Sequence, residues 1–540
     1  MSKDDKQNRD KREIVFLGGV EGVQGSCFYL NAGKRDYLID CGIKQEQPAE
    51  SPDFSYLNEK NIKIDGVFLT HAHLDHSGGL PYLEADDYLT EEAKIIATNP
   101  TKNLVETLLW DSLKIHKMET KNQGLDQSYG QNDIRSILGR FKGVDYGKYQ
   151  LNNLDIELGS STHILGSSWI KITLQGTKIT FSGDIGGNHR TNHLKELQNP
   201  GETDILVLES TYGDQKNQPS FTEAKNKVYK QIKESLNKNE PVLIPCFAIG
   251  RSQEILQLIR EREHQLPDTT EIVYDGMISK AMSDYHNYAT HSYMNEAIMN
   301  YKSNSNDLKP FLPDKAYKPN KMEERHRLLD GEKTPLIVAP SGMLEGGWSP
   351  YYLIKMTKNY ENAKIILTGH QVTGSVGRKL LEAKREDKNK VKVQVTALMP
   401  PEEADELNGK GYGFHEKNIK IPTNWVEQVN GFSGHSAANQ LLQFTRKTNP
   451  KKIYLTHGEP KTKKQFKTFL EKNLNSKIKI PKLNQKTTIK TKENGKTTIN
   501  PNKIKKLKTK INNLEQKIQK HEKTLQKLQT KNQKQNKKQK

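Results

Sequence analysis

At 540 residues the chain is longer than a single hydrophobic core usually serves, so we expect two domains and an appendage. Its three cysteines are few, odd in number and far apart, which argues against a disulfide framework and favours a reducing compartment, with the cytoplasm as the default. No stretch approaches the roughly 18 apolar residues of a membrane span, and the charged N-terminus has no hydrophobic signal core behind it.

The net charge of +19 is concentrated at one end of the chain. Residues 483–540 contain 18 lysines against 3 glutamates, which give +15 and leave +4 for everything before them. The basic character therefore belongs to a C-terminal tail, and the folded body is only mildly cationic.

The first 181 residues alternate between short apolar runs and glycine-rich turns. The runs predict strands at residues 13–17, 27–30, 37–39, 65–69, 151–157, 169–174 and 178–181. Leucine and isoleucine recur at near-helical spacing over residues 101–118, and residues 134–141 form a second helix candidate. This part of the chain is therefore typical of a mixed α/β domain.

The densest cluster of chemically active side chains follows the run 65–69. Residues 70–81 read Thr-His-Ala-His-Leu-Asp-His-Ser-Gly-Gly-Leu-Pro and contain His71, His73, Asp75 and His76. Imidazole nitrogen and carboxylate oxygen are preferred ligands of borderline divalent metals. The spacing lets His71 and His73 point one way while Asp75 and His76 reach another, so one loop could serve two ions; the alternative is a polar surface loop.

Five apolar runs end in a potential ligand or acid, namely Asp40, His71, Asp184, Glu209 and His457. A polar residue after a single strand is more often an ordinary turn residue. Strands that end together at one edge of a sheet, however, place such residues around one crevice, where mixed α/β folds bind their ligands. We therefore expect these five residues to meet.

From Glu209 onward the pattern changes to alternating strands and helices, which predicts a second α/β unit. Because residues of the same chemical type return at His435 and His457, the second unit is predicted to be inserted into the first. We expect boundaries at 1–208 and 396–482 for the two parts of the first domain, 209–395 for the insert, 483–502 for a linker and 503–540 for the tail. Residues 385–417, with their Pro-Pro and Gly-Lys-Gly-Tyr-Gly clusters, are interpreted as a surface loop.

The order of these motifs from residue 13 to residue 480 resembles the metallo-β-lactamase-fold nucleases of the β-CASP group, which includes the cleavage and polyadenylation endonuclease, its archaeal relatives and ribonuclease J. The resemblance implies an α/β fold, a metallo-β-lactamase αββα sandwich with an inserted β-CASP domain, followed here by a basic C-terminal helical tail. The residues that carry it are Asp40, His71, His73, Asp75, His76, His163 in Thr-His-Ile-Leu-Gly, Asp184, Glu209 in Glu-Ser-Thr-Tyr-Gly, His435 in Phe-Ser-Gly-His, and His457 in Thr-His-Gly-Glu.

The resemblance also implies roles for these residues. Two zinc ions are expected per chain, one bound by His71, His73 and His163, the other by Asp75, His76 and His457, with Asp184 bridging them. His435 is expected to be a general acid rather than a ligand, with Glu209 fixing its tautomer, and Asp40 to orient a ligand or the loop backbone. The alternative for His435 is a packed core histidine.

Substrate contacts are expected in three segments that match the family less closely. Arg251 ends a Phe-Ala-Ile-Gly-Arg segment, and its two interpretations are a phosphate ligand and an ordinary surface salt-bridge former. Ser341, Gly374 and Ser375 fall where relatives line the cleft with glycine-rich backbone. The last segment departs from the family pattern at His370, Thr373 and Ser375, which leaves substrate contacts at that wall open.

The sequence thus favours a zinc-dependent ribonuclease that hydrolyses single-stranded RNA in RNA processing or decay, as an endonuclease, a 5′–3′ exonuclease, or both. A DNA nuclease and a non-catalytic scaffold subunit of an RNA-processing complex are the alternatives. A small thioester hydrolase shares the His-rich loop but has no need of the insert, Glu209 or His435.

The tail carries apolar residues and one histidine at strict a/d spacing, namely Ile504, Leu507, Ile511, Leu514, Ile518, His521, Leu525 and Leu528. This spacing predicts a parallel two-stranded coiled coil and hence a homodimer. A single helix that binds RNA phosphates and a disordered basic extension are the alternatives, since the lysine density is very high.

Overall fold

The structure is a computed structural model that describes residues 12–44, 49–124, 126–152, 154–186, 193–304, 309–399 and 413–490. All of these except residues 175–177 and 490 belong to one compact unit. The predicted tail, with its alternatives of coiled coil, RNA-binding helix and disordered extension, lies outside the described residues. No helix in the described part of the chain is long and apolar enough to cross a membrane.

The first of two seven-stranded sheets is built from the N-terminal part of the chain, with the strand order β21-β1-β2-β3-β4-β5-β6. Strands β3 to β6 run parallel to one another, whereas β1 pairs antiparallel with both β2 and β21. The bounds are β1 Glu13–Phe16, β2 Cys27–Asn31, β3 Asp36–Cys41, β4 Ile64–Phe68, β5 Leu89–Thr98, β6 Phe141–Val144 and β21 Lys486–Thr488. The strands predicted at residues 13–69 are therefore confirmed.

The second sheet combines strands from both ends of the chain in the order β20-β19-β11-β10-β9-β8-β7. Its bounds are β7 Gly147–Leu151, β8 Leu154–Ser160, β9 Ser168–Leu174, β10 Thr177–Phe181, β11 Ile205–Glu209, β19 Lys452–Thr456 and β20 Lys477–Lys479. Strand β11 pairs parallel with β10 on one side and with β19 on the other. The chain between β11 and β19 is thus inserted into the first domain, as the sequence predicted.

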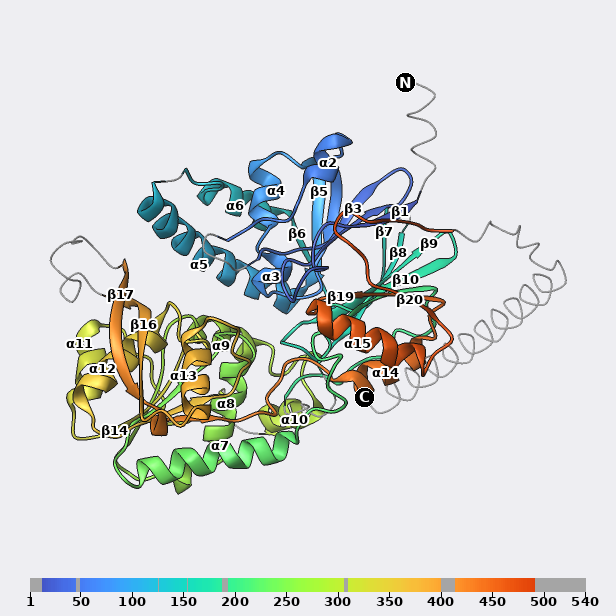
Figure 1. Cartoon of the computed structure of the whole chain (residues 1–540). Coiled ribbons are helices and arrows are strands. Elements are labelled where there is room, and N and C mark those ends of the chain that lie inside the picture. Colours follow the sequence, from blue (N-terminus) through green and yellow to red (C-terminus); the bar gives the residue numbers. More distant parts are fainter. Residues whose placement is uncertain are drawn as a thin grey trace, which may run out of the picture. The chain divides into compact units, whose positions relative to one another are not determined.

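The two sheets pack face to face around an apolar layer that includes Phe16, Phe28, Ile170, Phe181 and Tyr454. Helices cover the outer faces, as Figure 1 shows. On the first sheet these are α2 (Ser55–Glu59), α4 (Leu80–Ala85), α5 (Asn99–Gln123) and α6 (Gln131–Arg140), and on the second α14 (Ala438–Thr448) and α15 (Pro460–Glu471). The predicted αββα sandwich is therefore confirmed.

The insert is built around a five-stranded parallel sheet in the order β13-β14-β12-β15-β18. Its strands are β12 Val242–Pro245, β13 Thr270–Tyr274, β14 Thr334–Ala339, β15 Lys364–Leu367 and β18 Val426–Gln428. Helices α7 (Phe221–Leu236), α8 (Arg251–Arg260) and α9 (Ile278–Asn287) pack on one face, and α11 (Met322–Asp330), α12 (Trp348–Asn359) and α13 (Val376–Arg385) on the other. Because β18 joins this sheet, the sheet of the insert extends past the expected boundary at residue 395.

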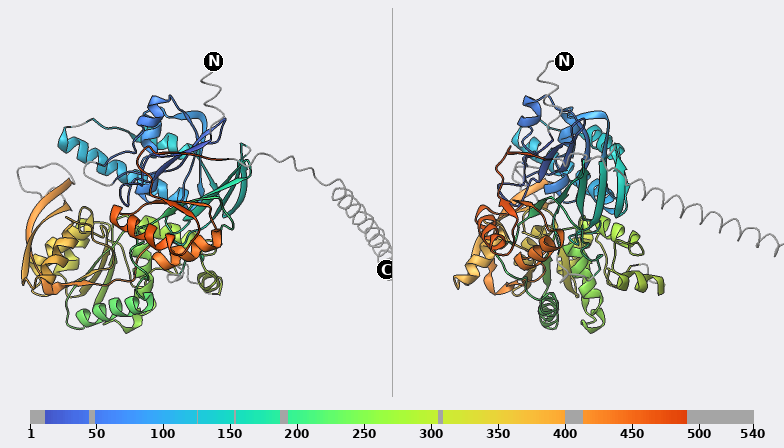
Figure 2. Two further views of the ribbon diagram at one scale, coloured as in Figure 1. Left: turned by 45° about the vertical axis from the view of Figure 1, so that its right-hand side comes forward. Right: turned by 90° about the vertical axis from the view of Figure 1, so that its right-hand side faces the viewer.

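The prediction of a surface loop at residues 385–417 is wrong at residues 390–399 and 413–417, which belong to strands. Strands β16 (Lys390–Met399) and β17 (Gly413–Pro422) form a two-stranded antiparallel sheet, and Figure 2 shows this hairpin in orange beside the yellow helix α12. Buried Val393 and Val395 alternate with exposed Lys392 and Gln394, the period-2 pattern of a half-buried strand. The proline and glycine clusters that suggested a loop fall at residues 400–412, outside the described residues.

Candidate metal centre

The five polar residues that follow apolar runs meet at one end of the sandwich. Asp40 lies in β3 and His71 follows β4, so both come from the first sheet. Asp184, Glu209 and His457 lie at the ends of β10, β11 and β19 in the second sheet. The expected crevice therefore exists, but it lies between the edges of two facing sheets rather than along one edge of a single sheet.

Asp40 holds the His-rich loop in place through three hydrogen bonds. Its carboxylate accepts from the backbone N–H of Thr70 at 2.7 Å and from the Thr70 hydroxyl at 2.8 Å. The same group lies 2.7 Å from Nδ1 of His76. When Nδ1 donates to Asp40, Nε2 of His76 is left with its lone pair facing Asp184. Asp40 thus fixes both the loop and the tautomer of one predicted ligand.

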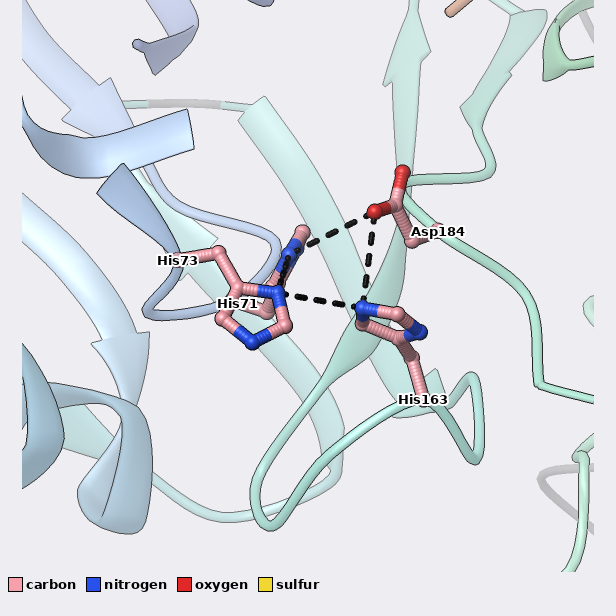
Figure 3. A group of neighbouring side chains, drawn as sticks. All are labelled: His71, His73, His163 and Asp184. Carbon is pink, nitrogen blue, oxygen red and sulfur yellow. Dashed lines mark hydrogen bonds and ion pairs between the residues drawn. The ribbon is translucent and has the colours of Figure 1, made fainter. Parts of the chain in front are cut away.

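Three imidazoles and one carboxylate converge in the first group, which comprises His71, His73, His163 and Asp184. Figure 3 shows their nitrogen and oxygen atoms directed toward one another. Nδ1 of His73 lies 3.2 Å from Nε2 of His71 and 3.1 Å from Nε2 of His163. Two nitrogens in a tetrahedral zinc site, each about 2.0–2.1 Å from the ion, are roughly 3.3 Å apart. The spacing of this group is therefore close to that of a tetrahedral metal site.

The second group comprises Asp75, His76, His457 and again Asp184. Oδ1 of Asp184 lies 3.3 Å from Nε2 of His76, and Oδ2 of Asp75 lies 3.3 Å from Nε2 of His457. Oδ2 of Asp184 lies 3.6 Å from Nε2 of His71 and 3.5 Å from Nε2 of His163, both in the first group. Each oxygen of Asp184 therefore faces a different group, which is the arrangement that a bridging carboxylate requires.

The residues present fit metal ions in chemistry as well as in spacing. Nε2 of His76 and Oδ1 of Asp184 are buried and have no hydrogen-bond partner, although buried polar atoms normally have one. Burial, followed by the charge of neighbouring histidines, holds the pKa of His71 and of His163 well below the usual range, so both imidazoles are neutral. Neutral imidazole is the form that binds a metal.

Asp184 and His76 also suit a metal ion. A cation would stabilise the carboxylate of Asp184 and would replace the proton of His76. Burial alone would raise the pKa of Asp184, but His457, His76 and other histidines outweigh it and hold that pKa well below the usual value. Burial likewise would lower the pKa of His76, but the carboxylates of Asp184 and Asp40 raise it well above the usual range. A metal ion bound here would take the place of the proton that His76 otherwise carries.

His435 and Glu209 form a pair beside the two groups. Nδ1 of His435 lies 3.2 Å from Oε2 of Glu209, and Glu209 also accepts the backbone N–H of Ile185 at 2.6 Å. Burial would lower the pKa of His435, but the charges of Glu209 and Asp184 raise it to about 9. Glu209, His435 and His457 also lie close enough together to hold an ion. At neutral pH the ring of His435 is thus protonated and can donate a proton.

A cleft with a volume of about 1780 Å³ opens onto these groups and is lined by residues of both the sandwich and the insert. The sandwich contributes His73, Asp75, Asp184 and His435, and the insert contributes the segments around Phe247, Ser341 and His370. A chain-like substrate could therefore reach both metal groups and the His435–Glu209 pair from one side.

Two of the predicted substrate contacts lie in the wall of the cleft. Arg251 lines it, but its side chain is only 9 % exposed and its Nη1 lies 2.5 Å from Oε2 of Glu254. Arg251 thus forms a salt bridge, but a buried one. Its contact with a phosphate group stays a prediction. Ser341 also lines the cleft, and its hydroxyl donates to the backbone carbonyl of Glu345 and accepts from its N–H.

The other two predicted contacts, Gly374 and Ser375, are described by the structure and are not among the residues that line the cleft. The Ser375 side chain is buried, and its hydroxyl caps α13 by accepting the backbone N–H of Arg378 at 3.2 Å. Gly374 has a φ of +91° directly before this cap. Their predicted contact with substrate stays untested, and their local role is to begin the helix.

Several residues that position the predicted ligands were missed in the sequence. The Thr211 hydroxyl lies 3.0 Å from Nδ1 of His457, and the backbone carbonyl of Gly434 lies 2.8 Å from Nδ1 of His163. Metal-bound histidines usually have such a partner on their second nitrogen. Thr211 and Gly434 each lie within two residues of a predicted site residue, but nothing in the sequence shows which distant histidine they face.

Stacked β-sheets that hold a His- and Asp-rich centre at one end define the class of metallo-β-lactamase-fold hydrolases, and three family models match the chain accordingly. The metallo-β-lactamase superfamily model matches residues 20–86, the β-CASP domain model residues 252–380, and the model of the Zn-dependent metallo-hydrolase RNA specificity domain residues 418–481.

Curated relatives extend the match over most of the chain. "Probable RNase MJ4" of Methanocaldococcus jannaschii is 30% identical over 457 residues, covering 83% of this chain and 93% of that protein. "Transcription termination factor FttA" of the same organism is 31% identical, covering 83% and 67%. "RNase aCSPSF2" of Saccharolobus solfataricus is 28% identical, covering 88% and 85%.

Among solved structures, a protein of unknown function from Enterococcus faecalis V583 superimposes with a TM-score of 0.50 at 12% identity, covering 89% of this chain and all of that one. This likeness concerns the fold alone. With the family models and the relatives, the assignment is complete: the chain belongs to the β-CASP family of the metallo-β-lactamase superfamily. The predicted family is therefore confirmed. Together with the two His- and Asp-rich groups, the family indicates that the chain binds a metal ion.

Proposed function

We propose that the chain is a two-zinc ribonuclease that hydrolyses phosphodiester bonds of single-stranded RNA in the cleft between the sandwich and the insert. The observation that carries this proposal is the sharing of Asp184 by two ligand groups, with the His435–Glu209 pair beside them. Relatives named as ribonucleases, at 28–30% identity over most of the chain, support RNA as the substrate.

One zinc ion is assigned to His71, His73 and His163 and the other to Asp75, His76 and His457, with Asp184 shared by both. Two such ions, when bound, would supply an activated water molecule as the nucleophile and would stabilise the charge on the phosphate. Asp40 keeps the lone pair of His76 directed at the centre, because it accepts the hydrogen bond of the opposite ring nitrogen. The carbonyl of Gly434 does the same for His163.

His435 is assigned the role of general acid toward the leaving 3′ oxygen of the cleaved bond. Its exposed side faces the cleft, while Nδ1 faces Glu209. A proton on Nδ1 is held by Glu209, which leaves Nε2 of the imidazolium to donate to the leaving oxygen. Glu209 thereby keeps His435 charged and oriented, and Ile185 N–H keeps Glu209 in place.

The alternatives are disfavoured by particular features. A scaffold subunit needs neither ligand group, yet both groups and the acid pair are complete. A small thioester hydrolase has no use for a cleft of about 1780 Å³ walled by a second domain. Discrimination between RNA and DNA requires contacts to the 2′-OH, and the cleft offers several polar groups that could make them.

The test is cleavage of 5′-labelled linear RNA, circular RNA of the same sequence, and the matching single-stranded DNA by the purified full-length protein with zinc supplied. We expect RNA to be cut and the activity to vanish after chelation and return with zinc. Cleavage of circles would exclude a purely 5′–3′ exonuclease, and intact circles beside degraded linear RNA would exclude an endonuclease. No cleavage of any RNA would overturn the proposal.

A further inference from the structure

The most exposed large apolar side chain in the described part of the molecule is Phe247, at 45 %. It follows β12 and lines the cleft together with the metal-binding residues. Burial of apolar surface stabilises a protein by roughly 25 cal/mol per Å². An aromatic ring that stays exposed to water does not contribute this free energy. Such a position is expected where a flat apolar partner covers the ring during function.

The backbone on both sides of Phe247 is held firmly. The N–H of Cys246 donates to the carbonyl of Ala339 at 3.0 Å, and the carbonyl of Phe247 accepts from the N–H of Ser252 at 3.3 Å in the first turn of α8. The side chain therefore projects from a fixed point. A partner that stacks on it encounters a preformed surface, so little conformational entropy is lost on binding.

Glycines keep the space around the ring open. A Cβ atom at Gly342 would lie 3.5 Å from Cδ2 of Phe247 and 3.2 Å from its backbone nitrogen, and one at Gly369 would lie 3.9 Å from Cε2. The ring thus lies against two stretches of bare backbone on the wall of the cleft, and the rest of its surface faces the open space. A side chain at either glycine would contact the edge of the ring.

The loop that carries Phe247 packs against the segment that carries one predicted metal ligand. A Cβ atom at Gly250, which has a φ of +89°, would lie only 2.9 Å from Cγ2 of Ile164. Ile164 follows His163 in the chain, and His163 belongs to the first ligand group. Phe247 therefore lies on the wall of the cleft that opens onto the predicted metal centre, where it can meet a nucleotide of a bound RNA.

We propose that Phe247 is a stacking platform for one nucleobase of the single-stranded RNA, next to the phosphate that is hydrolysed. The proposal rests on the proposed ribonuclease function and extends it to a specificity-determining residue. Every base has a π-face, so a phenyl ring can stack on any of the four bases. The ring therefore fixes where the RNA binds and does not select its sequence. Bases in a duplex are stacked on one another, so the platform selects unpaired RNA.

The test combines variants of the protein with gaps in the substrate. Single-stranded RNA oligonucleotides carry one abasic nucleotide at each position in turn around the cleavage site. Wild-type protein is compared with Phe247→Leu, Phe247→Trp and the control Tyr301→Leu, which alters an exposed aromatic residue that does not line the cleft. Thermal unfolding of each variant verifies that the fold is retained.

We expect the wild type to lose about tenfold or more in kcat/KM at one abasic position and little at the others. Phe247→Leu should show a similar loss on intact RNA and no further loss at that position. Phe247→Trp and Tyr301→Leu should keep the wild-type profile. The platform would be overturned if kcat/KM of Phe247→Leu still fell tenfold at the same abasic position. It would also be overturned if kcat/KM of the wild type were the same at every abasic position.

Failure of the ribonuclease proposal gives a different result from failure of the platform. If no RNA is cleaved, the same fluorescently labelled oligonucleotides are titrated and their anisotropy is measured. A loss of affinity at one abasic position that disappears in Phe247→Leu would support the platform without the reaction. Affinity that is independent of the abasic position in all variants would overturn it.

Discussion

Nδ1 of His435 lies 3.2 Å from Oε2 of Glu209, a carboxylate that precedes it by 226 residues and is 1 % exposed. Strand β11 ends at Glu209, and the segment before α14 carries His435, so the pair forms only when the chain returns from the insert to the sandwich. The acid pair is therefore complete only if the two parts of the first domain assemble around the inserted sequence.

Replacement of His435 by alanine should separate metal binding from proton transfer. We expect His435→Ala to bind two zinc ions per chain, as the wild type does, and to hydrolyse RNA about 10²- to 10⁴-fold more slowly, because a general acid is lost. Metal analysis and single-turnover cleavage measure the two quantities. The exposed His264 provides the control variant His264→Ala, which should match the wild type in both. Loss of one zinc from His435→Ala would mean that His435 is a ligand.

The alkaline limb of the pH–rate profile should depend on Glu209. The acid form of His435 is the active one, so the rate falls as pH rises through its pKa. Glu209 is the largest cause that raises this pKa, to about 9 without bound cations, and zinc ions would lower it. In Glu209→Gln the alkaline limb should therefore move to lower pH. The ratio of the wild-type rate to the variant rate should grow from pH 6 to pH 9.

The matched control for this profile is Glu382→Gln, which removes a surface carboxylate that pairs with Arg378. Its limb should coincide with that of the wild type. A Glu209→Gln variant that is slower by one constant factor at every pH would show that Glu209 positions His435 without setting its pKa.

Asp40 should act through the ligands rather than on the substrate. Asp40→Asn keeps the size of the side chain but weakens the hydrogen bond to His76 and the hold on Thr70. We expect about 10- to 100-fold weaker zinc affinity, measured by competition with a chromophoric chelator. Once zinc is saturating, the cleavage rate should recover. Asp65→Asn, which alters a carboxylate bound to Arg35 and to the backbone of Asp36, is the control and should leave affinity unchanged.

The ligand set could be predicted from the sequence because its densest part is local. His71, His73, Asp75 and His76 lie in six consecutive positions, and Asp184 and His457 each follow a short apolar run, whereas only the family resemblance pointed to His163. Such runs are the continuous apolar segments of buried strands, which are visible in the sequence itself. The family resemblance then assigned each residue to one of the two ions.

What the sequence could not predict depends on pairing between distant strands. Parallel strands in one sheet and strands in two facing sheets have the same local pattern, so the placement of Asp40 and Asp184 on different sheets was not visible. The hairpin at 390–422 was missed because turn residues at its centre outweighed the alternation at Val391, Val393 and Val395. Partners such as the carbonyl of Gly434 are set by the tertiary fold alone.

Lys463 gives the protein a pH-dependent stability that can be measured without activity. Its side chain is 1 % exposed, and its ammonium group donates to the carbonyl of Val20. The adjacent Gly19 carbonyl accepts the N–H of His457 at 2.7 Å, so this contact supports the loop behind a predicted ligand. Burial lowers the pKa of Lys463 from 10.5 to about 8, although Glu459 and Glu21 oppose the shift.

Between pH 8 and 10.5 the unfolded chain binds the proton of Lys463 and the folded chain does not, so the free energy of unfolding should rise with pH. The rise across this window is about 3 kcal/mol, at about 1.4 kcal/mol per pH unit. Lys463→Met carries no proton and should lack this rise. Urea unfolding of the chelated protein at pH 8 and pH 10 measures it, with Lys467→Met, at a half-exposed position of the same helix, as the control. If the wild type and Lys463→Met change in parallel with pH, Lys463 is not the group that titrates.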